Sequence, residues 1–94
     1  MRVRWTRRAL RSLDSIAEHI AKDRPMAAER IVERIYDSVV HLPRFPEIGR
    51  PGRVPGTREL IVSGTPFIIP YRIRRDDIEV ITVLHAARKW PDRF

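Results

Sequence analysis

Cysteine is absent from this chain of 94 residues, so the chain can form neither a disulfide nor a thiolate metal site. No apolar stretch approaches the roughly 20 residues that a transmembrane helix needs. The basic start MRVRWTRR is not followed by the apolar core of a secretory signal. We therefore expect a cytoplasmic protein that has no membrane contact and takes no cofactor.

Lysine is also scarce, because Lys22 and Lys89 are the only lysines among 19 basic residues. Twelve acidic residues oppose them, which leaves a formal net charge of +7 that arginine supplies almost alone. Arginine forms planar, bidentate contacts with carboxylates and phosphates. The composition therefore predicts an anionic partner, either a nucleic acid or an acidic protein surface.

Positive charge is concentrated at the beginning and in the second half of the chain. Residues 1–11 contain arginines and no acidic residue, whereas residues 12–42 contain more acids than bases. Basic residues again outnumber acidic ones from residue 43 onward. If the two basic segments meet in the fold, they form one basic face.

Two amphipathic helices are predicted in the first half of the chain. RVRW at 2–5 alternates arginine with apolar residues, as a half-buried strand does, and Thr6 after it is a suitable helix N-cap. DRP at 23–25 ends the first helix near Lys22 and starts the second at Pro25, which predicts a helical hairpin. The two apolar stripes are Leu10, Leu13, Ile16, Ala17 and Ile20, then Ala28, Ile31, Val32, Ile35, Val39 and Leu42.

Three strands are predicted after a long connection. Proline and glycine are dense over residues 43–56, where we expect a surface loop without regular structure. The strands are RELIV at 58–62, FIIPYRIR at 67–74 and IEVITVLH at 78–85. The last strand is apolar on both faces and should be interior, with Val80 and His85 on opposite faces. Pro70 lacks a ladder donor and should lie at an edge or a bulge.

The predicted order is β-α-α-β-β-β in a single domain over residues 1–94. This is an α+β fold in which a helical hairpin packs on one face of a small, mainly antiparallel sheet. The hairpin can cover only one face of that sheet. An exposed apolar second face beside basic residues would predict a protein partner that covers it.

Four segments resemble, in order and separation, the RelE/ParE superfamily of toxins from type II toxin–antitoxin systems. They are RVRWTRRALRSLDSIAEHI, PEIGRPGRVPGTRELIV, GTPFIIPYRI and IEVITVLHAARKWP, and they span essentially the whole chain. The resemblance implies the β-α-α-β-β-β fold and a cognate, ParD-like antitoxin whose C-terminal part wraps across the toxin. In such complexes operator DNA is bound through the antitoxin.

The superfamily divides into two chemistries. RelE-like members cut messenger RNA on the ribosome, with arginine and lysine on the phosphate and a tyrosine, histidine or glutamate for proton transfer. ParE-like members resemble inhibitors of DNA gyrase and have no catalytic chemistry of their own. Alignment with RelE-like members puts Ile68 in the place of a key arginine and Phe94 near the tyrosine that transfers protons, while Arg88 matches a functional arginine. The resemblance is therefore closer to the ParE branch, which implies a toxin that inhibits gyrase by binding and is not an enzyme.

The surface that binds the antitoxin or the target is predicted to contain Trp5, Arg58, Arg72, Arg74, Arg88 and Trp90. His85 is interpreted as a structural histidine at the end of its strand. In one alternative, a RelE-like endoribonuclease cuts messenger RNA on the ribosome, with Arg58 and Arg88 on the phosphate and His85 as the base. In a second, the chain is a non-toxic binding module that represses an operator together with its antitoxin. The three histidines have no metal-ligand spacing.

Overall fold

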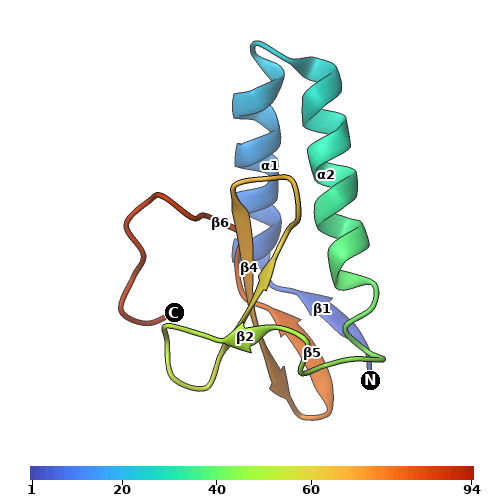
Figure 1. Cartoon of the computed structure of the whole chain (residues 1–94), viewed down its shortest axis with the longest axis vertical. Coiled ribbons are helices and arrows are strands. Elements are labelled where there is room, and N and C mark those ends of the chain that lie inside the picture. Colours follow the sequence, from blue (N-terminus) through green and yellow to red (C-terminus); the bar gives the residue numbers. More distant parts are fainter.

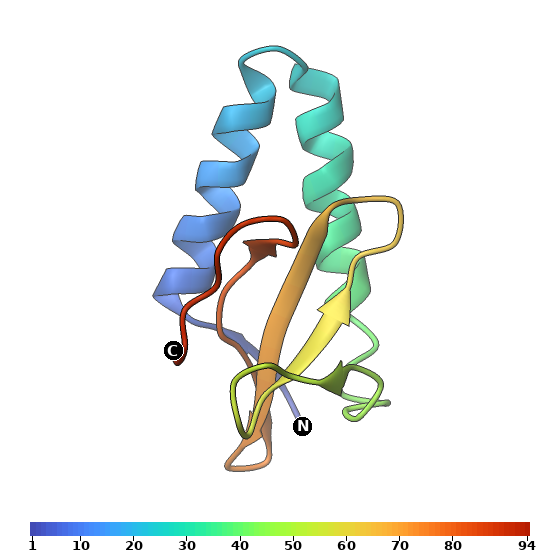
Figure 2. The same cartoon turned by 60° about the vertical axis from the view of Figure 1, so that its left-hand side comes forward.

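The computed structural model describes residues 1–94, and its helices and strands follow the predicted order with two added strands (Figure 1). The elements are β1 Val3–Trp5, α1 Arg7–Ala21, α2 Pro25–Val39, β2 Arg50–Pro51, β3 Arg58–Ile61, β4 Phe67–Arg74, β5 Asp77–Val80 and β6 Leu84–His85. The helical hairpin packs on one face of the sheet and extends past it at the end where the helices are connected (Figure 2). The predicted α+β fold is confirmed. Neither helix has the length and apolar character needed to cross a bilayer.

The sheet has the strand order β1-β5-β4-β3-β2, and β6 pairs with one end of β4. The β1–β5 pair is parallel and every other pair is antiparallel. The β4–β5 hairpin turns at Arg75 and Asp76, whose φ angles of 53° and 64° are those that a type I′ turn requires. Because β1 pairs with β5, the basic N-terminal segment meets the basic second half of the chain, which is the condition stated above for a single basic face.

Thr6 joins β1 to α1 and compensates for a missing hydrogen bond in the sheet. Pro70 lies in the central strand β4 rather than at an edge, and it has no N–H to donate. Its carbonyl accepts from the Ile81 N–H (2.9 Å), while the Ile81 carbonyl accepts from the Thr6 hydroxyl (2.8 Å). The same Thr6 oxygen accepts from the Ala9 N–H (3.0 Å) and caps α1, as predicted. Pro70 is therefore tolerated where the ladder between β4 and β5 ends.

We expect Thr6→Val to lower the free energy of unfolding by about 2 kcal/mol, because the change removes the cap and leaves the buried Ile81 carbonyl without its donor. Urea denaturation measures the loss. Thr6→Ser keeps the hydroxyl and is the matched control, which should remain within about 0.5 kcal/mol of the wild type. If Thr6→Val is as stable as the wild type, then neither hydrogen bond contributes to the stability of the fold.

The predicted strand over 78–85 is interrupted, and the interruption changes the side that His85 faces. β5 ends at Val80 and β6 begins at Leu84, and the residues between them pair with no strand. Val83 belongs to the same core cluster as Val80, and His85 lies on the same side as Val83. The expectation that Val80 and His85 lie on opposite faces of the sheet is wrong. The irregular residues between β5 and β6 shift the alternation of side chains between the two faces by one position.

Two other expectations about local structure need correction. Ala9, which was not assigned to the apolar stripe of α1, is fully buried, whereas Leu10 is 42% exposed. The buried face of α1 is therefore rotated by about one residue toward Ala9. The segment 43–56 is not entirely irregular, because Arg50 and Pro51 pair with β3 as the short strand β2.

The second face of the sheet is charged rather than apolar as expected, and its carboxylates are buried beneath arginine side chains that are themselves 35–53% exposed. Glu59 and Glu79 project from this face and are 2% and 9% exposed. Their partners come from neighbouring segments: Arg50 and Arg53 pair with Glu59, and Arg4, Arg72 and Arg74 pair with Glu79. The apolar Ile68 on the same face is buried as well. The need for a covering partner therefore does not follow from this face.

Candidate functional site

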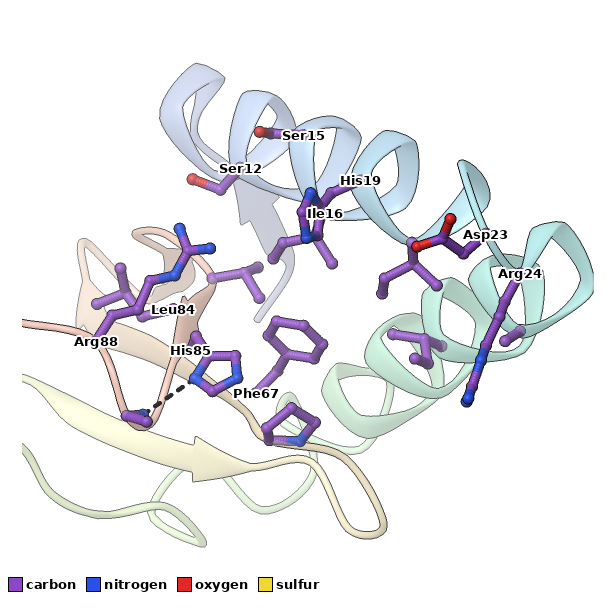
Figure 3. Close-up of a pocket in the computed structure, with 16 residues that line it drawn as sticks. Ser12, Ser15, Ile16, His19, Asp23, Arg24, Phe67, Leu84, His85 and Arg88 are labelled. Atoms are coloured by element: carbon purple, nitrogen blue, oxygen red, sulfur yellow. Dashed lines mark hydrogen bonds between the residues drawn. The ribbon is translucent and has the colours of Figure 1, made fainter.

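An open groove of about 850 Å³ lies where α1, the start of α2 and β6 meet (Figure 3). Half of its lining side chains are hydrophobic. The lining residues are Ser12, Ser15, Ile16, His19, Ile20, Asp23, Arg24, Ala27, Ile31, Pro66, Phe67, Val83, Leu84, His85, Ala87 and Arg88. The groove is thus bounded by the hairpin on one side and by the end of the sheet on the other.

Polar side chains stand on both sides of this groove. The hydroxyls of Ser12 and Thr82 share a hydrogen bond (2.9 Å), which ties α1 to the segment between β5 and β6. His19 enters the groove from α1 and His85 from β6 (Figure 3). Arg88 follows β6 and takes part in none of the ion pairs of the structure. Its charge is free to meet an anionic group of a ligand or partner.

His85 is held by local contacts. Its Nδ1 accepts a hydrogen bond from the Ala87 N–H (3.1 Å), shown dashed in Figure 3. Its ring meets the Phe67 ring edge-on, with 5.6 Å between centroids. A ring nitrogen that accepts this bond carries no proton, so a neutral His85 has its proton on Nε2. These contacts fit the interpretation of His85 as a structural residue.

Arg58 does not face the groove. Arg58 and Tyr71 both form hydrogen bonds with the backbone of residues 46–49, the segment before β2. Arg58 Nη1 donates to the carbonyls of Gly49 (2.7 Å) and Glu47 (3.2 Å). The Tyr71 hydroxyl donates to the Pro46 carbonyl (2.7 Å) and accepts from the Gly49 N–H (2.9 Å). Burial raises the pKa of the Tyr71 hydroxyl from its ordinary value of 10.0, although the hydrogen bond from Gly49 and the charge of Arg58 act in the opposite direction. Arg58 therefore has a structural role in the fold.

Arg72 and Arg74 lie on the second face of the sheet, beside Glu79. The Nε of Arg72 is 2.7 Å from the Glu79 carboxylate, and the Nη1 of Arg74 is 3.9 Å from it. Their side chains are 35% and 53% exposed. Arg72 chiefly compensates the buried carboxylate, while Arg74 is the more accessible of the two for a partner.

The two tryptophans are half-buried in different environments. Trp5 contacts the Tyr36 ring of α2 at 5.0 Å between centroids and packs against the core. Trp90 donates from Nε1 to the His85 carbonyl (3.3 Å), and the Arg53 guanidinium lies 3.8 Å from its ring centroid. Residues 86–94 contain no helix or strand, so the stack on Arg53 is one of the few contacts that hold this segment.

The residues of the nuclease alternative are not assembled in one place. Arg58 is the partner of Tyr71 across the β3–β4 pair, and His85 is the partner of Phe67 across the β4–β6 pair. At about 3.3 Å per residue these two positions of β4 are ~13 Å apart along the strand, and β3 and β6 flank β4 on opposite sides. His85 and Arg88 do line the same groove. No group of three or more histidines, aspartates and glutamates lies close enough together to hold a metal ion.

The apolar walls of the groove and His19 were not predicted as site residues. Ile16 and Ile20 were assigned to the apolar stripe of α1 and thereby to the core. The length of α1 was a signal for this groove in the sequence. A helix of 15 residues is about 22 Å long, and a small sheet cannot cover the whole of its apolar stripe. The uncovered end of that stripe forms one wall of the groove.

Comparison with known proteins identifies the family of the chain. Residues 3–90 match the family described as "ParE toxin of type II toxin-antitoxin system, parDE". "Putative toxin Y4kP" of Sinorhizobium fredii is 54% identical over 90 residues, which cover 96% of this chain and 93% of that protein. "Toxin RelE2" of Caulobacter vibrioides is 34% identical over 84 residues, which cover 89% of this chain and 93% of that protein.

A solved structure agrees in fold with the arrangement described above. A chain from the "Chromosomal ParDE TA system from P. aeruginosa" has a TM-score of 0.83 and 32% sequence identity to this protein. The likeness covers 90% of this chain and 95% of that one. The match over residues 3–90 and the extent of these relatives show that the chain belongs to the ParE toxin family of type II toxin–antitoxin systems.

Proposed function

We propose that this ParE-family toxin inhibits DNA gyrase by binding it, without catalytic chemistry of its own, and that a cognate antitoxin neutralises the toxin. The observation that carries the proposal is the family match over residues 3–90, together with a solved relative that comes from a ParDE system. Operator DNA would be bound through the antitoxin.

The groove is the surface that fits the antitoxin. Its wall of apolar side chains, with Ile16, Ile20 and Phe67 among them, suits the apolar face of an amphipathic segment. Arg88, which has no ion-pair partner, would meet a carboxylate of the same segment. An antitoxin segment bound there would lie between α1 and β6.

The absence of a phosphate clamp supports binding over catalysis. Ile68, at the position of the key RelE arginine, is 5% exposed, so it offers neither charge nor access. Removing one preorganised electrostatic stabiliser lowers a rate by ~10²–10³, and removing a general acid or base lowers it by ~10²–10⁴. These factors are not simply multiplied, because residues that act as a unit are non-additive. A site with only His85 and Arg88 would still be a very poor nuclease.

Purified gyrase tests this proposal. We expect the toxin to bind gyrase, to inhibit supercoiling of a plasmid and to accumulate cleaved DNA, because an inhibitor that traps the enzyme on DNA leaves broken strands. Preincubation with the cognate antitoxin should abolish all three effects. Gyrase that neither binds the toxin nor accumulates cleaved DNA would count decisively against this function.

The 34% identity with a protein named Toxin RelE2 favours one second candidate, a RelE-like endoribonuclease. Such an enzyme would use His85 and Arg88, which share the groove. Mapping of messenger RNA 5′ ends after induction separates the two functions. A ribosome-dependent nuclease creates new ends at fixed positions within codons, and a gyrase inhibitor creates none.

A further inference from the structure

Arginine side chains form the outer layer of the second face of the sheet, which is the face away from the helices (Figure 2). Arg4, Arg50, Arg53, Arg72 and Arg74 each lie within ion-pair distance of a carboxylate and are 35–53% exposed. The carboxylates beneath them, Asp77, Glu79 and Glu59, are 22%, 11% and 2% exposed. We call these arginines and carboxylates the arginine face. Five positive and three negative charges give it a net charge of +2, and the positive groups are outermost.

Strand register brings the arginine face together from two clusters of charge. Glu59 is opposite Pro70 in the β3–β4 pair, and Glu79 is opposite Arg72 in the β4–β5 pair. Pro70 and Arg72 are two residues apart in β4, so both lie on the same face of the sheet. With a strand spacing of about 4.8 Å and a rise of about 3.3 Å per residue, the two glutamates are ~12 Å apart. The guanidinium groups are therefore gathered around two neighbouring centres.

Two of the five arginines have side-chain donors that the fold does not use. Arg72 and Arg50 hold the buried carboxylates with hydrogen bonds of 2.7 and 3.0 Å. Arg53 and Arg74 come no closer than 3.8 and 3.9 Å to the same carboxylates, and their side chains donate no hydrogen bond. The Arg53 guanidinium is also stacked 3.8 Å from the centroid of the Trp90 ring, which holds its plane in place. Its N–H donors can meet acceptor oxygens without breaking a bond of the fold.

The charges that adjoin the arginine face do not reverse its sign. Arg75 and Asp76, in the turn between β4 and β5, carry opposite charges. Glu47, in the segment before β2, lies beside Arg58, so these two charges also cancel. The C-terminal segment 88–94, which reaches the face through the stack just described, contains three basic residues and one acid. The net positive charge of the face is therefore kept or increased by its surroundings.

We propose that the arginine face binds the sugar–phosphate backbone of duplex DNA, without reading its sequence. Phosphate oxygens are charged acceptors, and guanidinium groups with free N–H donors bind them strongly. One strand of duplex DNA carries a phosphate about every 3.4 Å of helix axis, so the ~12 Å between the clusters corresponds to about three or four phosphates. The choice of duplex DNA rests on the proposed function in one respect, because gyrase holds duplex DNA.

Other occupants fit the arginine face less well. A protein interface has apolar anchors and few charges at its centre. On this face Ile68 and Pro70 are buried, and the exposed Ile61 lies at the end of β3. A single strand needs exposed aromatic rings on which its bases stack, but the half-buried Trp90 ring is already stacked on Arg53. A second copy of this chain would bring another charge of +2 against the first, without apolar contacts to offset the repulsion.

The double variant Arg53→Gln with Arg74→Gln tests the assignment, by fluorescence anisotropy of a short labelled duplex of mixed sequence. Arg50 and Arg72 remain to hold the buried carboxylates in this variant. We expect its binding at ~50 mM salt to be weaker than that of the wild type by at least ~10-fold. The slope of log K against log salt concentration should become less steep by about two units, since each phosphate contact contributes close to ~0.9.

Arg11→Gln with Arg30→Gln is the matched control, because it removes the same amount of positive charge from the helices. Arg11 on α1 and Arg30 on α2 are exposed and take part in no ion pair. The control should bind the duplex within about twofold of the wild type and keep the wild-type salt slope. A difference between the two double variants then belongs to the arginine face and not to the net charge of the protein.

The outcomes separate this assignment from the gyrase proposal. The assignment is wrong if the wild type does not bind the duplex at low salt, or if the two double variants bind it equally well. It is also wrong if the wild type binds a single strand more tightly than the duplex. An Arg53→Gln, Arg74→Gln variant that loses antitoxin affinity but keeps DNA affinity would assign the face to an acidic protein segment instead. If the wild type binds the duplex with the expected slopes but does not bind gyrase, the arginine face stands and the gyrase proposal fails.

Thermal unfolding shows whether each variant is folded. Arg74→Gln alone, at a side chain 53% exposed and without a hydrogen bond, replaces the double variant if the latter unfolds. Its expected change in salt slope is about one unit, with Arg11→Gln alone as its control. An unchanged slope for Arg74→Gln would overturn the assignment.

Discussion

Ser15→Trp is expected to weaken binding of the cognate antitoxin by at least ~30-fold, because the new indole would occupy the groove that we assign to the antitoxin. Ser15 lines this groove from α1 and is exposed, so a larger side chain can project into the groove without disturbing the core. This loss of affinity is as large as the loss that follows when one hot-spot residue of an interface is removed. Titration calorimetry of purified toxin with antitoxin measures it.

Asp14→Trp is the matched control for the groove variant. Asp14 is the neighbouring residue on α1 and is also exposed, but it does not line the groove. This variant should bind the antitoxin with wild-type affinity and be neutralised by it in cells. Ser15→Trp should arrest growth even when the antitoxin is expressed beside it. If Ser15→Trp binds the antitoxin as tightly as the wild type does, then the antitoxin binds outside the groove.

Gly49→Ala is expected to lower the free energy of unfolding by about 3 kcal/mol, because the segment before β2 has no room for a side chain at this position. A Cβ on Gly49 would lie 2.6 Å from the Cε1 and 2.7 Å from the hydroxyl of Tyr71, and 3.0 Å from the Glu59 carbonyl. The Tyr71 side chain is fully buried in the central strand and cannot move aside. The segment must therefore shift and lose its hydrogen bonds to Tyr71.

Chemical denaturation with tryptophan fluorescence measures the effect of Gly49→Ala. Glu47→Ala changes an exposed side chain in the same segment and is the control, with an expected change within about 0.5 kcal/mol. If Gly49→Ala unfolds at the same urea concentration as the wild type and the control, then the segment is not packed on Tyr71 as described here.

The helices could be predicted because their signals are local in the sequence. Thr6 caps α1 and Pro25 occupies the first turn of α2, and both act on residues within one turn of themselves. The order of the strands along the chain could also be predicted, because turn residues separate the apolar runs and a short hairpin turn joins two of them. The parallel β1–β5 pair has no such local signal, because it joins residues 75 positions apart, such as Val3 and Ile78.

The interruption between β5 and β6 could not be predicted from periodicity. The hydrogen-bond ladder between β4 and β5 ends at Pro70, which has no N–H to donate to the Ile81 carbonyl. Thr6 donates to that carbonyl instead. Thr6 and Ile81 are far apart in the chain, so no window of the sequence contains both. The side that His85 faces depends on this long-range detail.

The roles of the predicted site arginines could not be inferred from residue type. Arg72 is held by Glu79 because the β4–β5 register places the two opposite each other. Arg58 is held by backbone carbonyls of a segment that contains no regular structure until β2. Among the predicted arginines, Arg88 alone lines the groove, where it has no carboxylate within ion-pair distance. Whether an arginine is structural or available is decided by its neighbours in the folded chain, which the sequence pattern does not reveal.

Pulse labelling of new DNA and new protein in the minutes after induction, without the antitoxin, tests most directly whether this toxin acts on gyrase. We expect DNA synthesis to fall first and the DNA-damage response to rise, while protein synthesis continues. If protein synthesis falls first, the ribosome is the target, and His85 and Arg88 in the groove must then be reinterpreted as the edge of an active site.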